Sequence, residues 1–371
     1  MAALLDRPLC RLCRERQGRA VSELKTPAGT RCYICEGLMD DIEKTAAKVV
    51  AKVRRYEFGT FSVGLSMPEG VQEREDEYRS NLKLKGNETV RVQAARLIAA
   101  QVAEALGKRI DRGRPDLTAV VDLSSGGVSV SSKSVYFYAR YTKPRGVPQK
   151  RGFCDACSGR GCDKCRGTGF DLAPSVEGQL RRRLEAACGT DRMKFTWLGS
   201  EDRESRVNPP GRPFVAELKS PVKRSVPRRF SLRTGRGLVR VSRGKALPSK
   251  PTRLPSFTFK TLIKAEAASA PMDEDMAAFG RVFRQAEVRF DRPHEKPTSK
   301  MVHSARVRRR GRSISVEAVL DGGLPVKRFV SGELVSPSVS EVLKTEVRCR
   351  TFDILEVKET GEFGFGKISW V

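Results

Sequence analysis

The sequence lacks any long apolar run, since none approaches the roughly 20 residues that a transmembrane helix requires. Its opening, Met1 to Asp6, is too short and too soon interrupted by charge to be a secretory signal peptide. We therefore expect an intracellular, cytoplasmic protein with no membrane partner. In a reducing compartment the ten cysteines are expected to be thiolate ligands rather than to form disulfides.

Acidic residues are scarce. The chain has 44 Asp and Glu against 71 Lys and Arg, and its net charge of +27 is spread along the sequence. Such a field attracts polyanions, most often nucleic acid, although charge alone would also suit a basic ribosome-associated or thermostable protein. Residues 221–255 contain no acidic residue at all, which predicts a basic loop with a partial hairpin that is either solvated or wrapped around an RNA backbone.

Histidine is absent near the first cysteines, which form two Cys-x-x-Cys pairs within residues 1–40. The spacing suits a zinc ribbon, and an iron–sulfur cluster is the alternative. Without a nearby histidine to leave an open coordination position, we expect a structural metal that supplies much of the folding free energy of this segment. The expected ligands are Cys10, Cys13, Cys32 and Cys35.

A second cysteine group lies in two back-to-back Cys-x-x-Cys-x-Gly-x-Gly units within residues 150–170. Glycine permits the positive backbone angles that fold a chain tightly around a metal, so we expect a second structural zinc ion. The repeat also resembles the zinc domain of J-domain chaperones, but the chaperone's further repeats and J-domain are missing. The leftover Cys188 and Cys349 are expected to be small buried hydrophobes. The expected ligands are Cys154, Cys157, Cys162 and Cys165.

An acidic residue set among arginines follows in the segment Gly199-Ser-Glu-Asp-Arg-Glu-Ser-Arg206, ahead of Gly211-Arg-Pro-Phe214 and an apparent strand. A carboxylate beside guanidinium groups has a depressed pKa, so it is ionised at neutral pH and can act as a nucleophile or base on an anchored substrate. Local pattern alone favours another interpretation, in which Glu201, Asp202 and Glu204 are solvated loop charges paired with neighbouring arginines.

This segment resembles the active-site segment of the archaeal and eukaryotic tRNA pseudouridine synthases that modify positions 54 and 55 of the T-arm. The likeness extends over nearly the whole chain, because the alternating helices and strands of residues 41–138 resemble the THUMP-containing domain of the same family. The sequence departs from the family pattern at Ser200, Glu204, Pro209-Pro210 and Gly332 to Val335.

The resemblance implies an α+β protein, in which a zinc-bearing THUMP-like α/β domain precedes a pseudouridine synthase domain whose mixed sheet is split by a basic cleft. The predicted parts are a zinc-ribbon-like module at 1–40, a THUMP-like RNA-binding domain at 41–149, a four-cysteine zinc knuckle at 150–170 and a catalytic domain at 171–371.

The implied reaction converts a uridine of tRNA into pseudouridine: the N-glycosidic bond breaks, the uracil rotates and it rejoins the ribose through C5. The target base must first be flipped out of its stack. No organic cofactor is implied, which agrees with the lack of a nucleotide-binding glycine loop. Two structural zinc ions are expected, and the implied partner is tRNA, bound by a monomer through its T-arm and acceptor region.

The resemblance also assigns residues. Asp202 would be catalytic, as nucleophile or base, and Lys327 would hold it ionised. Phe259 would stack on the flipped base or be an ordinary core aromatic. Arg206 and Arg212 would shape the catalytic loop. The basic residues after the last THUMP-like strand would contact phosphates or form a charged linker; they are Arg140, Lys143 and Arg145.

Two alternatives to a synthase stay open. One is a non-catalytic, zinc-containing tRNA-binding protein or RNA chaperone on a synthase scaffold, which the departures from the family pattern allow. The other is a J-type protein chaperone that uses the second cysteine group.

Overall fold

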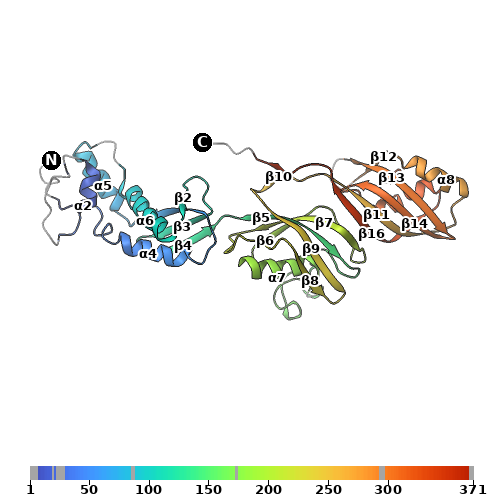
Figure 1. Ribbon diagram of the computed structural model, residues 1–371, viewed down its shortest axis with the longest axis horizontal. Helices are drawn as coiled ribbons and strands as arrows, with labels where there is room; N and C mark the ends of the chain where they lie inside the picture. The colour runs from blue at the N-terminus through green and yellow to red at the C-terminus, as the bar shows by residue number, and fades with distance from the viewer. Residues whose placement is uncertain are drawn as a thin grey trace. The chain divides into compact units, whose positions relative to one another are not determined.

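A computed structural model describes residues 7–18, 21, 30–84, 88–171, 174–291 and 297–366. It divides the chain into two compact units (Figure 1): unit 1 comprises Met1–Ser134 with Lys219–Arg224, and unit 2 comprises Val135–Leu218 with Ser225–Val371. The predicted boundaries at 40 and 149 fall inside these units. Residues 135–143 were expected to close the THUMP-like domain, but they form a strand within the large sheet of unit 2.

Unit 1 is a four-stranded sheet with the order β2-β1-β3-β4. β1 runs parallel to β2 and β3, and β4 is antiparallel to β3. The strands are β1 (Thr60–Ser66), β2 (Arg109–Ile110), β3 (Leu117–Asp122) and β4 (Gly127–Ser132). The helices are α2 (Arg11–Gln17), α4 (Ile42–Val53), α5 (Val71–Asn81) and α6 (Val90–Leu106).

Helices α4 and α6 pack on each other and on the sheet through the apolar stripes that the sequence predicts, so that Val49, Phe61 and Ile98 are fully buried. The Thr89 hydroxyl caps α6 by accepting a hydrogen bond from the backbone N–H of Val92. Helix α5 was not predicted, because its sequence is polar almost throughout and it buries few residues.

The first cysteine group shares its core with the rest of unit 1. Leu9 and Ile34 belong to the same hydrophobic cluster as Val49 and Phe61. A short segment buries too little surface to be stable alone. The predicted module at 1–40 is therefore part of unit 1.

A buried ion pair also joins α2 to α5, with Arg16 Nε 2.8 Å from a carboxylate oxygen of Glu75.

Unit 2 contains an 11-stranded sheet with the order β15-β12-β13-β14-β11-β16-β7-β5-β9-β8, in which β6 also pairs with β7. Its strands are β5 (Val135–Lys143), β6 (Met193–Trp197), β7 (Val207–Leu218), β8 (Phe230–Thr234), β9 (Gly237–Leu247), β11 (Phe257–Ala267), β12 (Ala286–Phe290), β13 (Thr298–Arg310), β14 (Ser313–Asp321), β15 (Val335–Ser336) and β16 (Val347–Glu359). The predicted basic loop at 221–255 contains the hairpin β8–β9. A separate pair joins β10 (Pro251–Arg253) to β17 (Gly364–Phe365).

The large sheet is divided at its middle. β7 and β16 are paired at one position, Val207 with Ile354. One half, β5 to β9, packs on α7 (Val176–Cys188). The other half, β11 to β16, packs on α8 (Asp273–Val282; Figure 1) and α9 (Val326–Ser331), and α10 (Val339–Val342) packs on these two helices. The loop that carries Glu201 and Asp202, residues 199–206, immediately precedes Val207, the residue of β7 that pairs with β16.

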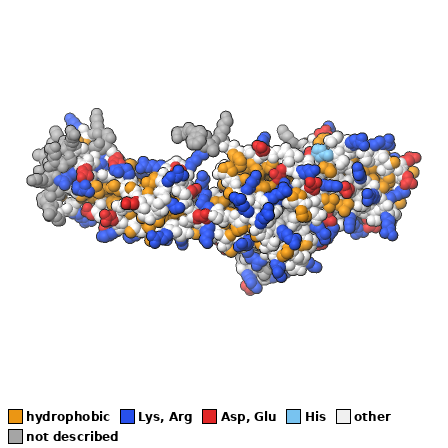
Figure 2. All heavy atoms as spheres, in the orientation of Figure 1, with side chains coloured by type: hydrophobic (Ala, Val, Ile, Leu, Met, Phe, Trp, Pro, Cys, Tyr) orange, Lys and Arg blue, Asp and Glu red, His pale blue; other side chains and the backbone are white. Residues whose placement is uncertain are grey.

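Lys and Arg side chains are spread over both units on the face shown in Figure 2, with Asp and Glu set among them. The excess positive charge of the sequence therefore reaches the surface. Among the described residues, no helix combines the length and apolar character needed to cross a bilayer.

Candidate active site

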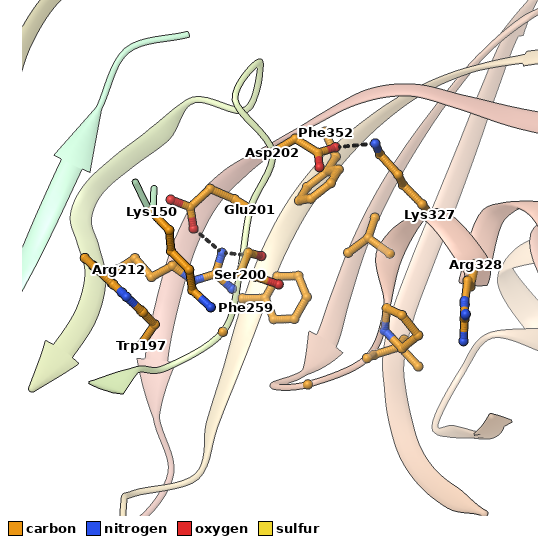
Figure 3. Close-up of a pocket in the computed structure, with 15 residues that line it drawn as sticks. Lys150, Trp197, Ser200, Glu201, Asp202, Arg212, Phe259, Lys327, Arg328 and Phe352 are labelled. Carbon is orange, nitrogen blue, oxygen red and sulfur yellow. Dashed lines mark hydrogen bonds and ion pairs between the residues drawn. The ribbon is translucent and has the colours of Figure 1, made fainter. Parts of the chain in front are cut away.

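A cavity of about 770 Å³ lies in unit 2 where the two halves of the sheet separate (Figure 3). One wall is the loop after β6, and the opposite wall is the turn before α9 with the start of that helix. Arg212, Phe259 and Phe352 reach it from β7, β11 and β16. The lining residues are Lys150, Trp197, Gly199, Ser200, Glu201, Asp202, Arg212, Phe259, Gly323, Leu324, Pro325, Val326, Lys327, Arg328 and Phe352.

Asp202 and Lys327 meet across this cavity from opposite walls (Figure 3). The Lys327 ammonium lies 2.8 Å from Asp202 Oδ2, and the two side chains are 58% and 39% exposed. The hydrogen bond to Asp202 raises the pKa of Lys327 above its ordinary value, so the lysine is charged at neutral pH. The structure thus brings together the two residues that the sequence paired over a separation of more than one hundred positions.

The Glu201 side chain is completely buried at the cavity wall. The Tyr141 hydroxyl donates to one carboxylate oxygen at 2.6 Å, and Arg212 donates to the other at 3.0 Å. Gln149 adds a third hydrogen bond at 3.2 Å. Burial, followed by the charge of Glu201, raises the pKa of Tyr141 well above its ordinary value. Because Glu201 is held inward, its neighbour Asp202 is the carboxylate that a ligand can reach.

Arg212 organises the start of the loop. Its guanidinium donates to the carbonyl oxygens of Leu198 at 3.2 Å and Ser200 at 3.0 Å. Gly199 has a φ of +93°, and a Cβ at this position would clash with an Arg212 nitrogen. Only glycine fits there without displacing the guanidinium. These contacts agree with the predicted loop-shaping role of Arg212.

Lys143 binds the second part of the loop, residues 202–205, through its ammonium group. Its ammonium donates to the carbonyl oxygens of Asp202 at 3.0 Å, Arg203 at 3.2 Å and Ser205 at 2.5 Å. The side chain is fully buried, and this burial lowers the pKa of Lys143 to about 8. The lysine therefore acts as an internal anchor for the loop that carries Asp202.

The predicted phosphate contacts at Arg140 and Lys143 are wrong, because β5 is an inner strand and both side chains are buried. Arg140 donates to the carbonyl oxygens of Gly211 and Val357 and pairs with Glu359. Arg145 is one-third exposed, but its guanidinium is bound to Asp353 and to the Glu204 carbonyl oxygen.

We expect Lys143→Met to lower kcat by about 10- to 100-fold, because three loop carbonyls lose their donor and small displacements of a catalytic group are costly. Because the pKa of Lys143 is about 8 in the folded protein and 10.5 in the unfolded chain, the unfolded chain binds the Lys143 proton more tightly than the folded protein does. The contribution of Lys143 to the unfolding free energy should therefore rise between pH 8 and 10.5 and stay flat below pH 8.

Steady-state kinetics and urea unfolding at pH 7.5 and 9.5 measure both effects. The control is Arg203→Met, an exposed position in the same loop. Equal kinetics in the two variants would contradict the anchoring role.

The other predicted site residues are divided between two places. Phe259 lines the cavity and is almost wholly buried, with the Arg212 guanidinium 5.8 Å from its ring centroid. Arg206 does not line the cavity: its backbone N–H donates to Asp353 at 2.9 Å, and its exposed side chain lines a separate groove. Trp197 and Phe352 are two further cavity aromatics that the sequence analysis did not assign to the site.

Sequence reasoning also missed the residues that position the loop, namely Tyr141, Gln149 and Asp353. The alternation of β5 contains a signal for one of them, because Phe137, Ala139 and Tyr141 occur at every second position and share one buried face. Nothing in the local sequence marks Gln149 or Asp353, since each acts on a segment far along the chain.

Each cysteine group brings its four sulfur atoms within 4.8 Å of one another. The measured Sγ–Sγ distances are 3.7 Å for Cys10 with Cys35 and 3.8 Å for three pairs in the second group. Four thiolates about 2.3 Å from one tetrahedral ion have edges of about 3.8 Å, so both sets fit a metal ion. In the second group, the backbone N–H groups of Gly161 and Gly169 donate to sulfur atoms.

Comparison with known proteins gives the family. Residues 45–122 match the family model of the archaeal Pus10 THUMP domain. A solved Cbf5-Nop10-Gar1 complex is similar over 60% of this chain and 48% of that chain, at a TM-score of 0.32 and 8% identity. A tRNA pseudouridine synthase Pus10 of Cenarchaeum symbiosum is 32% identical over 352 residues, covering 92% of this chain and 85% of the relative. Those of Nitrosopumilus maritimus and Korarchaeum cryptofilum are each 29% identical and cover 88% and 90% of this chain and 86% and 94% of their own length. The chain therefore belongs to the Pus10 tRNA pseudouridine synthase family.

Proposed function

We propose that this protein is a tRNA pseudouridine synthase that isomerises uridine at position 54, position 55 or both in the T-arm, with Asp202 as its catalytic residue. The observation that carries the proposal is the exposed Asp202 carboxylate, held 2.8 Å from the Lys327 ammonium at a cavity of about 770 Å³. That volume lies in the range of small-molecule sites and admits a single flipped nucleotide.

The chemistry follows from these positions. Asp202, paired with Lys327, either attacks the nucleotide or removes a proton from its ribose, and in both routes the bond between N1 of uracil and C1′ breaks. The uracil turns within the cavity and a bond forms between C5 and C1′, while any bond that Asp202 has formed breaks, or the ribose proton returns to the carbon from which it came. C5 then loses its proton and N1 gains one. The product is an isomer of the substrate, so no external reactant is consumed. The rings of Phe259 and Phe352 line the cavity that receives the base.

Release of tritium tests the reaction directly. T-arm RNA labelled with tritium at uridine C5 should lose the label to water when the protein is added, because only C5–C1′ bond formation displaces that hydrogen. Two further RNAs, with uridine at position 54 alone or position 55 alone, identify the site. Salt-sensitive tRNA binding without release would show a binding protein or RNA chaperone, and preference for unfolded polypeptide would show a protein chaperone.

A groove of about 820 Å³ on the β5–β9 half supports RNA backbone binding. Among the described residues that line it there are four exposed arginines and no Asp or Glu: Arg206, Arg229, Arg240 and Arg243. Three of them come from the basic segment 221–255. Guanidinium groups without competing carboxylates suit the phosphates of a polyanion.

We expect Arg240→Ala combined with Arg243→Ala to weaken tRNA binding and to reduce the slope of log K against log salt by about 2, because each lost phosphate contact releases fewer counterions. Filter binding at four salt concentrations measures the slope. The charge-matched control, Arg281→Ala with Arg284→Ala, changes exposed arginines at the end of α8. Equal slopes in both double variants would count against the groove.

We propose zinc as the ion of both cysteine groups, since four thiolates without histidine or carboxylate suit a closed structural site. Native mass spectrometry should find two ions per chain. Cys13→Ser and Cys157→Ser should each retain one ion, because the two groups lie in different units. Loss of both ions from either variant would contradict independent sites. A monomer that acts on tRNA in the cytoplasm remains our proposal for its working state.

A further inference from the structure

The segment of the second cysteine group, residues 150–170, is called the knuckle below. We propose that its aromatic stack, Phe153 on Phe170, binds an unpaired base of the RNA next to the target uridine. The inference rests on the proposed function, because it takes RNA as the substrate. It assigns Phe153 as a contact residue outside the catalytic cavity.

Phe153 is 71% exposed, more than any other large apolar side chain among the described residues. Its ring stacks on Phe170 at a centroid distance of 5.6 Å and an interplanar angle of 19°. A Cβ at position 159 would lie 3.0 Å from the Phe153 ring, so the Gly159 backbone lies close to the ring and helps to hold it in place. The Phe153 side chain is therefore held in place by Phe170 and Gly159 while most of its surface is open to solvent.

A short chain segment, Gln149 to Arg151, connects the aromatic stack to the cavity wall. Gln149 donates to Glu201 beneath the catalytic loop, and Lys150 lines the cavity itself (Figure 3). Arg151 follows, with its guanidinium 3.9 Å from the ring centroid of Phe170. Phe153 follows the cavity residue Lys150 by three positions, and three residues span at most about 11 Å. Phe153 is therefore within reach of a nucleotide that adjoins one bound in the cavity.

The charge around the stack favours nucleic acid over polypeptide. The knuckle has five basic residues (Lys150, Arg151, Arg160, Lys164 and Arg166) against two acidic ones (Asp155 and Asp163). Asp155 is already paired with Lys164 at 2.7 Å. Aromatic faces beside cationic side chains are the combination that binds unpaired bases, whereas a site for unfolded polypeptide needs a broader apolar surface.

Truncation tests the contact. Phe153→Ala should weaken binding of T-arm RNA by about 5- to 150-fold, the range that loss of one stacked base produces, and Phe153→Tyr should bind like the wild type. The matched control is Phe365→Ala, which removes a ring of another stacked phenylalanine pair; Phe365 is 36% exposed, about half as much as Phe153. Zinc content by mass spectrometry should be the same in all variants, because Phe153 is at the surface.

Fluorescence gives a readout that does not depend on affinity. The chain has two tryptophans, so the emission of Phe153→Trp can be followed as a difference from the wild type. Stacking on a base should quench this emission on addition of RNA, and Phe365→Trp should not respond. The inference is overturned if Phe153→Ala binds T-arm RNA as tightly as the wild type and RNA does not quench Phe153→Trp. It is also overturned if Phe153→Ala loses affinity for unfolded polypeptide and keeps its affinity for RNA. Tritium release by wild-type protein, measured in parallel, shows separately whether the proposed function holds.

Discussion

The Asp202→Asn variant is expected to release tritium at least about 10²-fold more slowly than the wild type, while its affinity for T-arm RNA stays within a few-fold. The amide has nearly the same shape and still offers Lys327 an oxygen atom, but it can neither attack the ribose nor accept its proton. Loss of a general base alone costs up to about 10⁴ in rate, and loss of a nucleophile costs more.

Single-turnover tritium release and filter binding on the same preparations separate catalysis from binding. Glu204→Gln is the matched control, because this carboxylate is two positions away on the same loop and 64% exposed. It should retain activity within about twofold. Release by Asp202→Asn at a rate close to that of the wild type would remove Asp202 from the mechanism, even if the protein proves to be a synthase.

The second large effect is expected from Glu201→Ala, which should lower the unfolding free energy of unit 2 by about 3–5 kcal/mol. The substitution leaves the Arg212 guanidinium buried without its partner, and breaking one side of a buried ion pair has a cost of this size. It also removes the acceptor of the Tyr141 hydroxyl. Urea unfolding followed by tryptophan fluorescence reports on unit 2, because Trp197 belongs to it.

A double variant, Glu201→Met with Arg212→Met, tests the cause. Replacing both charges by apolar groups of similar volume should recover much of the lost stability, because no unpaired charge remains buried. Activity should not recover, since Arg212 also holds the carbonyl oxygens of Leu198 and Ser200. A single variant as stable as Glu204→Ala, which alters an exposed carboxylate, would contradict the anchoring role of Glu201.

The two cysteine groups show how much a local pattern can predict. Cys-x-x-Cys pairs bring two sulfur atoms together within one turn of chain, so their spacing alone identified both groups of four. The α/β character of residues 41–134 was similarly readable, because helical and strand periodicities depend on neighbouring residues. The pairing of Asp202 with Lys327 needed a family resemblance, since no local pattern links residues so distant in sequence.

Burial of charge was the property that the sequence could not supply. The sequence predicted Arg140 and Lys143 as surface cations. In the structure both are buried, because β5 is paired with β7 on one side and with β9 on the other. Glu201 and Asp202 are adjacent carboxylates in one loop, and nothing local indicates which faces inward. That choice is made by Tyr141, Gln149 and Arg212, which reach Glu201 from other segments.

The sequence by itself determined the excess of positive charge, the two groups of four cysteines and the α/β character of residues 41–134, because these depend on composition and short spacings. Only the tertiary structure decided where the units divide, which carboxylate is exposed, and that Asp202 and Lys327 line the same cavity. The physical reason is that solvent exposure and the partners of a charge are set by contacts between segments far apart in the chain, which composition and spacing do not encode.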